Sequence, residues 1–556
     1  MAPKEHHFLL FRHCPRKTGE SVVPLSGLPS DISNYVNSPS PNWGALGSRW
    51  CLQASEDIFY NTGIWMIESG MINPGQKIQW EMIPDDSTRD VDTAYYLTTG
   101  IYDELIEKFG EDFASFGEQT IKADSRFFYP TSEMCSKTYR TSEVQAEILD
   151  RLKHLPRPTL GFTEALQMLQ QLAGIGKLGD LTELLSDEPE YDASHGELDG
   201  SASVLAEAAE MMFFTRAGGL EHPYIPKANK QQVFEFLQFE DYMRSVTKVE
   251  NSKAATHGAP QVQAMMRVLA QGYYSSPATP DEDYDTRVTV FVGHDGDLDT
   301  MATALGVRWI LQEPYISGKD GAFLPTPPMS GIHAVRRFDE ETDRIDLSFV
   351  YPMYAQADSA KFVLNTTGIL EHTPLIFQDE FKGASMDDRS THITAHGSKS
   401  SLKLLEEHIL NVLSSYNRGA AQCYHSSAKY WAAQDAKRQQ VLKTASGTTD
   451  LAQESLIPAV TIPQNIYTPD STQTVPVNAQ LSASQSFSRE DLMTSFGIGI
   501  VAGMSNVLLF WLVYRFFSRR RRQYRRLCWS DDCTDTDMSC TSDDSSDDEV
   551  ETAKLV

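Results

Sequence analysis

Residues 287–311 read "RVTVFVGHDGDLDTMATALGVRWIL", and this stretch decides the fold. Its first part, VTVFV, is a continuous β-branched and apolar run, which is typical of a strand buried on both faces. The turn GHDGD follows, and apolar residues then repeat at helical spacing from Leu298 to Trp309. Strand, loop and helix in this order are the repeating unit of an α/β sheet.

A second strand is predicted near the start of the chain, where residues 6–16 read "HHFLLFRHCPR". In open parallel sheets, ligands collect at the carboxyl ends of the strands. His13 and His294 both stand at such ends, so we expect a site that contains them. His6 and His7 precede the apolar run, and we expect their side chains to be solvated.

Composition sets the broad class of the protein. The chain has 556 residues, of which 41% are hydrophobic, enough for a large core and more than one compact unit. A net charge of −28 argues against a nucleic-acid partner, because phosphate backbones need a basic face. The seven cysteines lack the spacing of a zinc module. A disulfide between Cys135 and Cys423 is possible, but the sequence alone does not assign it.

The chain divides into several parts. Residues 1–110 and 285–445 are predicted to form an α/β core. Between them, residues 111–284 hold segments with helical periodicity, such as "KQQVFEFLQFEDYMRSVTKV", which indicate a mainly helical cap. Residues 446–494 are rich in Ser, Thr and Pro and read as a stalk.

The C-terminal part predicts a single membrane span. Residues 495–517, "SFGIGIVAGMSNVLLFWLVYRFF", are long and apolar enough to cross a bilayer. Residues 518–556 form a basic and then acidic tail, and basic flanks stay on the cytoplasmic side. The body would then be lumenal or extracellular. The alternative is a buried core helix followed by a basic tail.

The route to the membrane leaves a conflict, because "MAPKEHHFLLFRH" has no apolar segment long enough for a signal peptide. Either the natural start lies upstream of Met1, which we favour, or the protein is tail-anchored with its body in the cytosol. The sequon Asn365-Thr366-Thr367 is compatible with a lumenal glycoprotein.

The polar residues at the two strand ends suggest phosphoryl chemistry. Arginines offer forked donors that match the oxygens of a phosphate. The neutral imidazole of His13 is a sound nucleophile, and neighbouring positive charge favours that neutral form. The carboxyl group of Asp295 could protonate a departing alkoxide, a step worth roughly 10²–10⁴-fold in rate.

Three segments carry a resemblance to a known family. "RHCPR" at 12–16 resembles the Arg-His-Gly-x-Arg signature of histidine acid phosphatases, and "GHDGDL" at 293–298 is similar to their His-Asp motif. "STRDVDTAYYLTTGIY" at 87–102 is similar to their mid-chain arginine segment. The resemblance extends over roughly residues 5–430, in the order of the family.

The resemblance implies a fold and a mechanism. The fold would be α/β, a mostly parallel central sheet flanked by helices with an inserted, mainly helical cap. His13 would be the nucleophile and form a phosphohistidine, His294 would stabilise the transferring group, and Asp295 would protonate the leaving group. Because Asp295 must start protonated, low pH would be favoured. The phosphate would be held by Arg12, Arg16 and Arg89.

The same resemblance defines the partners. The substrate would be a small phosphomonoester, and neither a metal nor an organic cofactor is implied. Whether the protein forms a homodimer is left undecided by the sequence. The sequence departs from the pattern at three positions, where Cys14 replaces a glycine, Thr18 a proline and Asp297 an asparagine. The glycine lets the backbone approach the phosphate, so Cys14 predicts slow turnover.

Several alternatives remain at these positions. Cys14 could be a reactive thiol between arginines, Arg89 a surface charge, Asp295 a helix N-cap and His13 a structural histidine. At the level of function, the alternative to the enzyme is a catalytically weak, phosphatase-like ectodomain that acts as a binding module.

Overall fold

The computed structural model describes a large part of the chain up to residue 446. The described residues are 3–15, 51–72, 78–110, 117–121, 123–136, 138–172, 189–193, 196–217, 228–273, 284–318, 321–352, 367–378, 384–386, 391–396 and 398–446. Arg16, Thr18, Asn365, the stalk from residue 447, the expected span 495–517 and the tail lie outside them. In the described part of the chain, no helix combines the length and the apolar character needed to span a bilayer.

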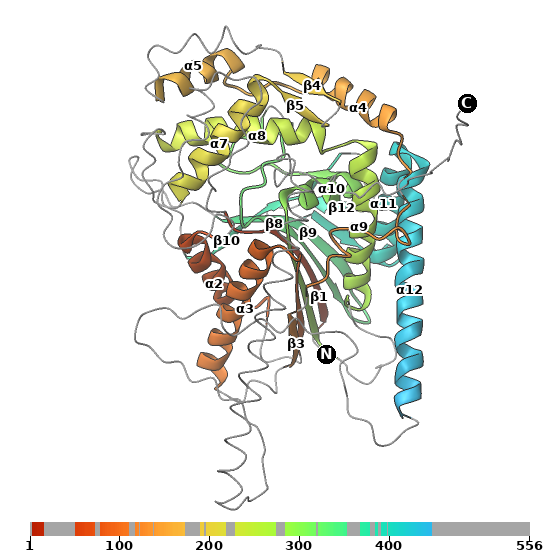
Figure 1. Ribbon diagram of the computed structural model, residues 1–556. Coiled ribbons are helices and arrows are strands. Elements are labelled where there is room, and N and C mark those ends of the chain that lie inside the picture. Colours follow the sequence, from red (N-terminus) through yellow and green to blue (C-terminus); the bar gives the residue numbers. More distant parts are fainter. Residues whose placement is uncertain are drawn as a thin grey trace, which may run out of the picture. The chain divides into compact units, whose positions relative to one another are not determined.

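A nine-stranded sheet forms the centre of the molecule, with the order β12-β13-β9-β8-β1-β6-β2-β3 and β10 paired with β9 (Figure 1). The β1, β6, β2 and β3 strands are parallel, as expected around the candidate site, and the remaining strands are added antiparallel. The bounds are β1 (Lys4–Arg12), β2 (Ile78–Pro84), β3 (Gly117–Ile121), β6 (Thr286–Gly293), β8 (Gly331–Phe338), β9 (Asp343–Pro352), β10 (Leu370–Pro374), β12 (Ala384–Met386) and β13 (Thr391–Thr394).

Strand β1 lies inside the sheet, between β6 and β8, and is buried from His6 to its end. This position explains the apolar run "FLLF", because a central strand is covered on both faces. It also overturns the expectation of solvated histidines. His6 and His7 are part of the strand and are buried, with His6 Nδ1 3.0 Å from the carbonyl of Leu269 and His7 Nδ1 3.2 Å from His333 Nε2.

Helices cover the two faces of the sheet (Figure 1). On one side α2 and α3 pack against each other, and on the other side α9, α10, α11 and α12 pack together. The approach of α9 to α10 depends on Gly258, where a Cβ atom would lie 2.0 Å from the carbonyl oxygen of Thr300. The bounds are α2 (Gln53–Glu68), α3 (Thr88–Phe109), α9 (Ser252–Gln271), α10 (Asp295–Leu305), α11 (Ser401–Tyr416) and α12 (Arg418–Ser446).

The cap lies beyond the carboxyl edge of the parallel strands and is mainly helical (Figure 1). It contains α4 (Thr141–His154), α5 (Phe162–Leu172), α7 (Ser201–Ala217), α8 (Lys230–Thr247) and the hairpin of β4 (Glu190–Asp192) with β5 (Glu197–Asp199). Two elements within the range 111–284 belong to the core. Strand β3 pairs with β2, and α9 packs against β1. A further short pair joins β7 (Val307–Arg308) to β11 (Ile376–Phe377).

A buried ion pair joins the cap helix α8 to the core helix α10. Arg244 of α8 is 1% exposed, and its guanidinium grips both carboxylate oxygens of Asp299 at 3.0 and 2.8 Å. The same guanidinium donates to Asp241 at 3.1 Å and to the carbonyl of Leu324 at 3.1 Å. Because the partners are buried, loss of one leaves the others uncompensated, and this pair therefore holds the cap to the core.

We expect Arg244→Leu to lower the free energy of unfolding by about 3–5 kcal/mol, because it leaves buried carboxylates without a cationic partner. Urea unfolding followed by circular dichroism measures this change. The control is Arg140→Leu, which removes an exposed pair with Glu143 and should cost less than about 1 kcal/mol. Equal losses in the two variants would show that Arg244 does not tie the cap to the core.

Candidate active site

The two strand-end histidines meet because their strands are neighbours. Strands β1 and β6 run parallel with Arg12 opposite Gly293. His13 directly follows β1 and His294 directly follows β6, so the two histidines lie at the same edge of the sheet. The His13 amide donates to the carbonyl of Gly293 at 2.8 Å, and the two imidazole rings stand edge to face with centroids 4.5 Å apart. A Cβ atom at Gly293 would lie 2.4 Å from the ring of Phe128, so only glycine fits there.

The third parallel strand adds acidic residues to the same edge. The amide of Asp85, just after β2, donates to the carbonyl of Val292 at 3.0 Å. Helix α3 begins three residues later and carries Arg89 and Asp90 in its first turn. Arg89 is 6% exposed, so the alternative of a surface charge is wrong.

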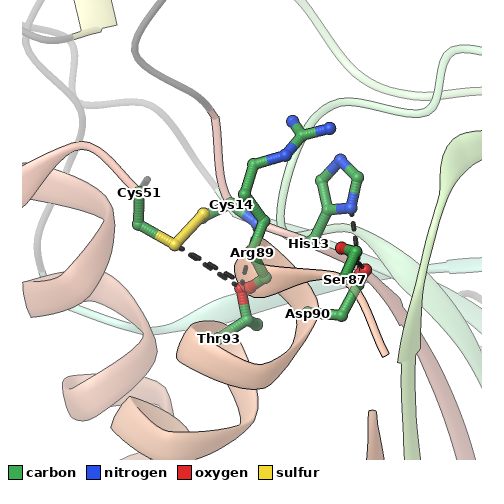
Figure 2. The surroundings of a disulfide bond; sticks show 7 residues. All are labelled: His13, Cys14, Cys51, Ser87, Arg89, Asp90 and Thr93. Carbon is green, nitrogen blue, oxygen red and sulfur yellow. Dashed lines mark hydrogen bonds and ion pairs between the residues drawn. A yellow bond between two sulfur atoms is a disulfide. The ribbon is translucent and has the colours of Figure 1, made fainter. Parts of the chain in front are cut away.

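Asp90 holds the ring of His13 in place. Its carboxylate is fully buried, and Oδ1 lies 3.0 Å from His13 Nδ1, while the hydroxyl of Ser87 donates to Oδ2 (Figure 2). An ionised carboxylate can only accept hydrogen bonds, so the hydrogen of the neutral imidazole sits on Nδ1. The lone pair of Nε2 is then left for a ligand.

The two histidines have opposite charge preferences. Burial lowers the pKa of His13, and the positive charges of Arg89, His294 and Arg12 lower it further, so His13 is neutral. Burial also opposes the charged form of His294. Its carboxylate neighbours, Asp85 at 3.7 Å and Asp90 at 3.5 Å, nevertheless raise its pKa to about 9. The site thus places a neutral imidazole beside a cationic one.

Arg12 is paired with two carboxylates. Its Nη2 lies 3.4 Å from Asp295 Oδ2 and 3.5 Å from Glu240 Oε1, and Nη1 donates to the carbonyl of Thr326. Burial alone would raise the pKa of Asp295, but the guanidiniums of Arg12 and Arg244 outweigh it and hold that pKa far below the usual range. These guanidiniums therefore favour the carboxylate form of Asp295 as long as no phosphate competes for Arg12.

Asp297 organises the start of helix α10. Its Oδ2 accepts the backbone N–H of His294 at 2.8 Å, and its Oδ1 accepts Nε2–H of Gln261 at 2.9 Å. His294 occupies the N-cap position, so the alternative that Asp295 is the N-cap is wrong. Burial raises the pKa of Asp297 to about 7, although the positive charge of His294 opposes this.

A disulfide fixes the residue that follows His13. Cys14 is bonded to Cys51, its amide donates to Thr93 Oγ1 at 3.1 Å, and its side chain points toward Cys51, away from the His13 ring (Figure 2). The alternative of a reactive Cys14 thiol is therefore wrong. The sequence analysis missed this bond, and the Cys135–Cys423 pairing that it left open is formed.

Three ligand-type side chains at the site, from His13, Asp90 and His294, lie within 4.8 Å of one another. Such a spacing could hold a metal ion. The hydrogen bond between His13 and Asp90 already uses two of these groups, and Arg12 and Arg89 add positive charge that opposes a cation. We interpret the cluster as a hydrogen-bonded network that positions His13.

The expected site residues converge in one place. The structure brings together Arg12, His13, Arg89, His294 and Asp295, while Arg16 lies outside the described residues. The sequence analysis missed the carboxylates of Asp85, Asp90 and Glu240 and the guanidinium of Arg244. No motif distinguishes them from surface charges, and only their burial beside the histidines and Arg12 does so.

Solved structures of phytases have a similar fold. The chain is similar to the apo form of the Hafnia alvei phytase, with a TM-score of 0.52, 16% identity, and coverage of 75% of this chain and 98% of that one. It is also similar to the Klebsiella sp. ASR1 phytase (TM-score 0.51, 14% identity, 75% and 97% covered) and the Citrobacter braakii phytase (0.50, 15%, 75% and 99%).

These likenesses concern the fold, because the identities are low. The chain has the histidine acid phosphatase fold, which confirms the fold that the sequence motifs imply. No protein-family model matches the chain, and no curated protein matches it.

We expect Asp90→Asn to lower the pKa of His294 by about 1 unit, because it removes one of the carboxylates that stabilise the imidazolium. It should also weaken the preference of His13 for the tautomer with its hydrogen on Nδ1. Nitrogen chemical shifts of selectively labelled histidines measure both effects. Asp92→Asn, two residues along the same helix, is the control. Unchanged shifts in Asp90→Asn would contradict this account of His13.

Proposed function

We propose that the protein is a phosphatase that hydrolyses small phosphomonoesters through a phosphohistidine intermediate. The observation that carries the proposal is the pairing of a neutral, oriented imidazole with a cationic one at the carboxyl edge of a parallel sheet. His13 supplies the nucleophile, and His294 with the guanidiniums of Arg12 and Arg89 supplies the positive charge that a phosphoryl group requires.

The reaction has two steps. In the first, Nε2 of His13 forms a bond to phosphorus while the bond from phosphorus to the leaving oxygen breaks, and that oxygen takes a proton from a carboxylic acid. In the second, water attacks the phosphorus, the phosphorus–nitrogen bond breaks, and inorganic phosphate and neutral His13 are released. Arg12 must exchange carboxylate partners for phosphate oxygens. By resemblance, Arg16 adds a third guanidinium.

The substrate is expected to carry little negative charge beyond its one phosphate. The pocket beside Arg12 is lined by three acidic side chains, Glu210, Glu240 and Asp241, together with Phe213, Phe214, Phe234 and Tyr315. Apart from Arg12, this lining offers further phosphates no cationic partner. The phytase neighbours share the fold, but this lining favours a small monoester over inositol hexakisphosphate.

The alternative of an inactive binding module rested on Cys14. The Cys14 side chain is held in the bond with Cys51 and points away from the His13 ring, which supports the enzyme over that alternative. The same bond ties the nucleophile's neighbour to the segment before α2, which favours a rigid site over slow turnover.

The decisive test of the proposal is His13→Ala in the full-length chain. We expect hydrolysis of p-nitrophenyl phosphate to fall by roughly 10⁴-fold, because no nucleophile remains. In the unmodified protein, brief mixing with labelled substrate should trap a phosphoenzyme that is stable to alkali and labile to acid. His425→Ala, an exposed histidine on α12, is the control. Equal rates in His13→Ala and the unmodified chain would refute the phosphatase function.

We further propose that the body faces an oxidising lumen or the outside, anchored by residues 495–517 with a cytoplasmic tail. The disulfides Cys14–Cys51 and Cys135–Cys423 support this location, since such bonds are rare in the cytosol. The tail-anchored cytosolic form is the alternative, and the homodimer stays a prediction.

Protease treatment of sealed membrane vesicles tests the location. We expect the body to be protected, and residues 518–556 to be digested, because the basic flank stays cytoplasmic. Alkylation before reduction should leave all four body cysteines unlabelled. Digestion of the body in sealed vesicles would establish the cytosolic alternative.

A further inference from the structure

The pocket beside Arg12 has an aromatic wall. Phe213 of α7, Phe234 of α8 and Tyr315 line it. The ring of Phe234 stands edge to face against both of the others, with centroids 6.4 Å from Phe213 and 5.2 Å from Tyr315. These rings exclude water from one side of the pocket, so charges inside it interact more strongly than they do in bulk solvent.

Three acidic residues share this lining. Glu210 comes from α7, and Glu240 and Asp241 are consecutive on α8. Within the described part of the chain, Arg12 is the one basic residue of the lining. A phosphate that pairs with Arg12 takes up its positive charge, and acidic groups then predominate in the pocket.

Neighbouring cations do not balance these acidic groups. Arg244 donates to Asp241 at 3.1 Å, but the same guanidinium also holds both carboxylate oxygens of Asp299. Burial raises the pKa of Asp241 well above its usual range and that of Glu240 to about 7. Both shifts occur although two guanidiniums, those of Arg12 and Arg244, oppose them. The buried carboxyl groups thus receive too little positive charge to offset their burial.

The lining also holds two buried hydrogen-bond donors that lack a partner among the described residues. They are Nε of Arg12 and the hydroxyl of Thr326, a residue that is 1% exposed. The two residues are adjacent, because Nη1 of Arg12 donates to the carbonyl of Thr326. Buried polar groups are normally hydrogen-bonded, so this part of the pocket fits a ligand with acceptor atoms. The oxygens of a phosphate ester meet that requirement.

We propose that the pocket selects phosphomonoesters of primary amino alcohols, with the phosphate on Arg12 and the ammonium group among the carboxylates of Glu210, Glu240 and Asp241. The inference rests on the proposed phosphatase function and names its substrate class. An ammonium group carries three hydrogen-bond donors, which match carboxylate acceptors. Its charge offsets the excess of buried acidic groups, and its methylene chain lies against the aromatic wall.

The geometry sets the length of the substrate. Oε1 of Glu240 lies 3.5 Å from Nη2 of Arg12. A chain of a few atoms is therefore long enough to join a phosphate on the guanidinium to an ammonium group on the carboxylate. The expected substrate is a small zwitterion, such as 2-aminoethyl phosphate.

Two ligands that differ only in the ammonium group test the inference by binding. 3-Aminopropylphosphonate ends in an ammonium group where butylphosphonate ends in a methyl group, and neither is hydrolysed, because carbon replaces the ester oxygen. Isothermal titration calorimetry on the full-length chain measures both dissociation constants. We expect the aminoalkyl ligand to bind about 10–100-fold more tightly, as for hydrogen bonds to a charged group. Equal affinities would overturn the inference.

Charge-removing variants locate the ammonium group. We expect Glu210→Gln and Glu240→Gln each to lower the ratio of the two dissociation constants about 10-fold. The ratio cancels a general loss of phosphonate binding, and thermal unfolding checks that each variant is folded. Glu235→Gln, on α8 but outside the lining, is the matched control and should retain the ratio. If both pocket variants retain it as well, the ammonium group binds elsewhere and the inference is wrong.

Hydrolysis separates this inference from the proposed function. The unmodified chain should have a higher kcat/KM for 2-aminoethyl phosphate than for propyl phosphate, and Glu210→Gln should reduce that advantage. If the phosphatase function fails, neither ester is hydrolysed faster than by His13→Ala, while the phosphonate ratio still reports the ammonium site. If only the substrate class is wrong, both esters are hydrolysed and the two phosphonates bind equally.

Discussion

The site depends on the parallel pairing of β1 with β6. Their register sets Arg12 against Gly293, and the two histidines of the site follow directly after these residues. The pairing places His13 against His294, and β2 on the other side of β6 brings Asp85 to the same level. A slip of one residue would turn these side chains to the opposite face of the sheet. The buried apolar runs of these strands therefore fix the geometry of the site.

Charge balance is the second constraint. Positive groups that would hold a phosphate are already neutralised by buried carboxylates, because unpaired charges in a dry interior are costly. Asp90 contacts both histidines, since one oxygen accepts from neutral His13 and the other lies 3.5 Å from cationic His294. Burial and the nearby arginines keep His13 neutral, whereas the carboxylates keep His294 cationic. A phosphate that enters must replace carboxylates as the partner of Arg12, so binding is an exchange of anions.

The features that depend on the order of residues along the chain could be predicted from the sequence. The strands that end in His13 and His294, and the helix that carries Arg89, follow from periodicity and from motifs at strand ends. The carboxylates Asp85 and Glu240 did not follow, because their meaning lies in burial and in neighbours remote along the chain. The Cys14–Cys51 bond was missed for the same reason, as pairing needs distance. His6 and His7 were wrongly placed in solvent because polar side chains at the start of a central strand look like a solvated flank.

The docking of the cap and the charges of the site depend on the same residue in this fold. Arg244 fixes α8 to α10 through Asp299, and the same guanidinium, 3.6 Å from Asp295, lowers the pKa of that carboxyl group. By fixing α8, it also sets the distance between Glu240 and Arg12, at 3.5 Å. The lining of the pocket beside Arg12 is therefore complete only when the cap is docked on the core. The position of the cap and the charges around Arg12 are thus linked through a single buried arginine.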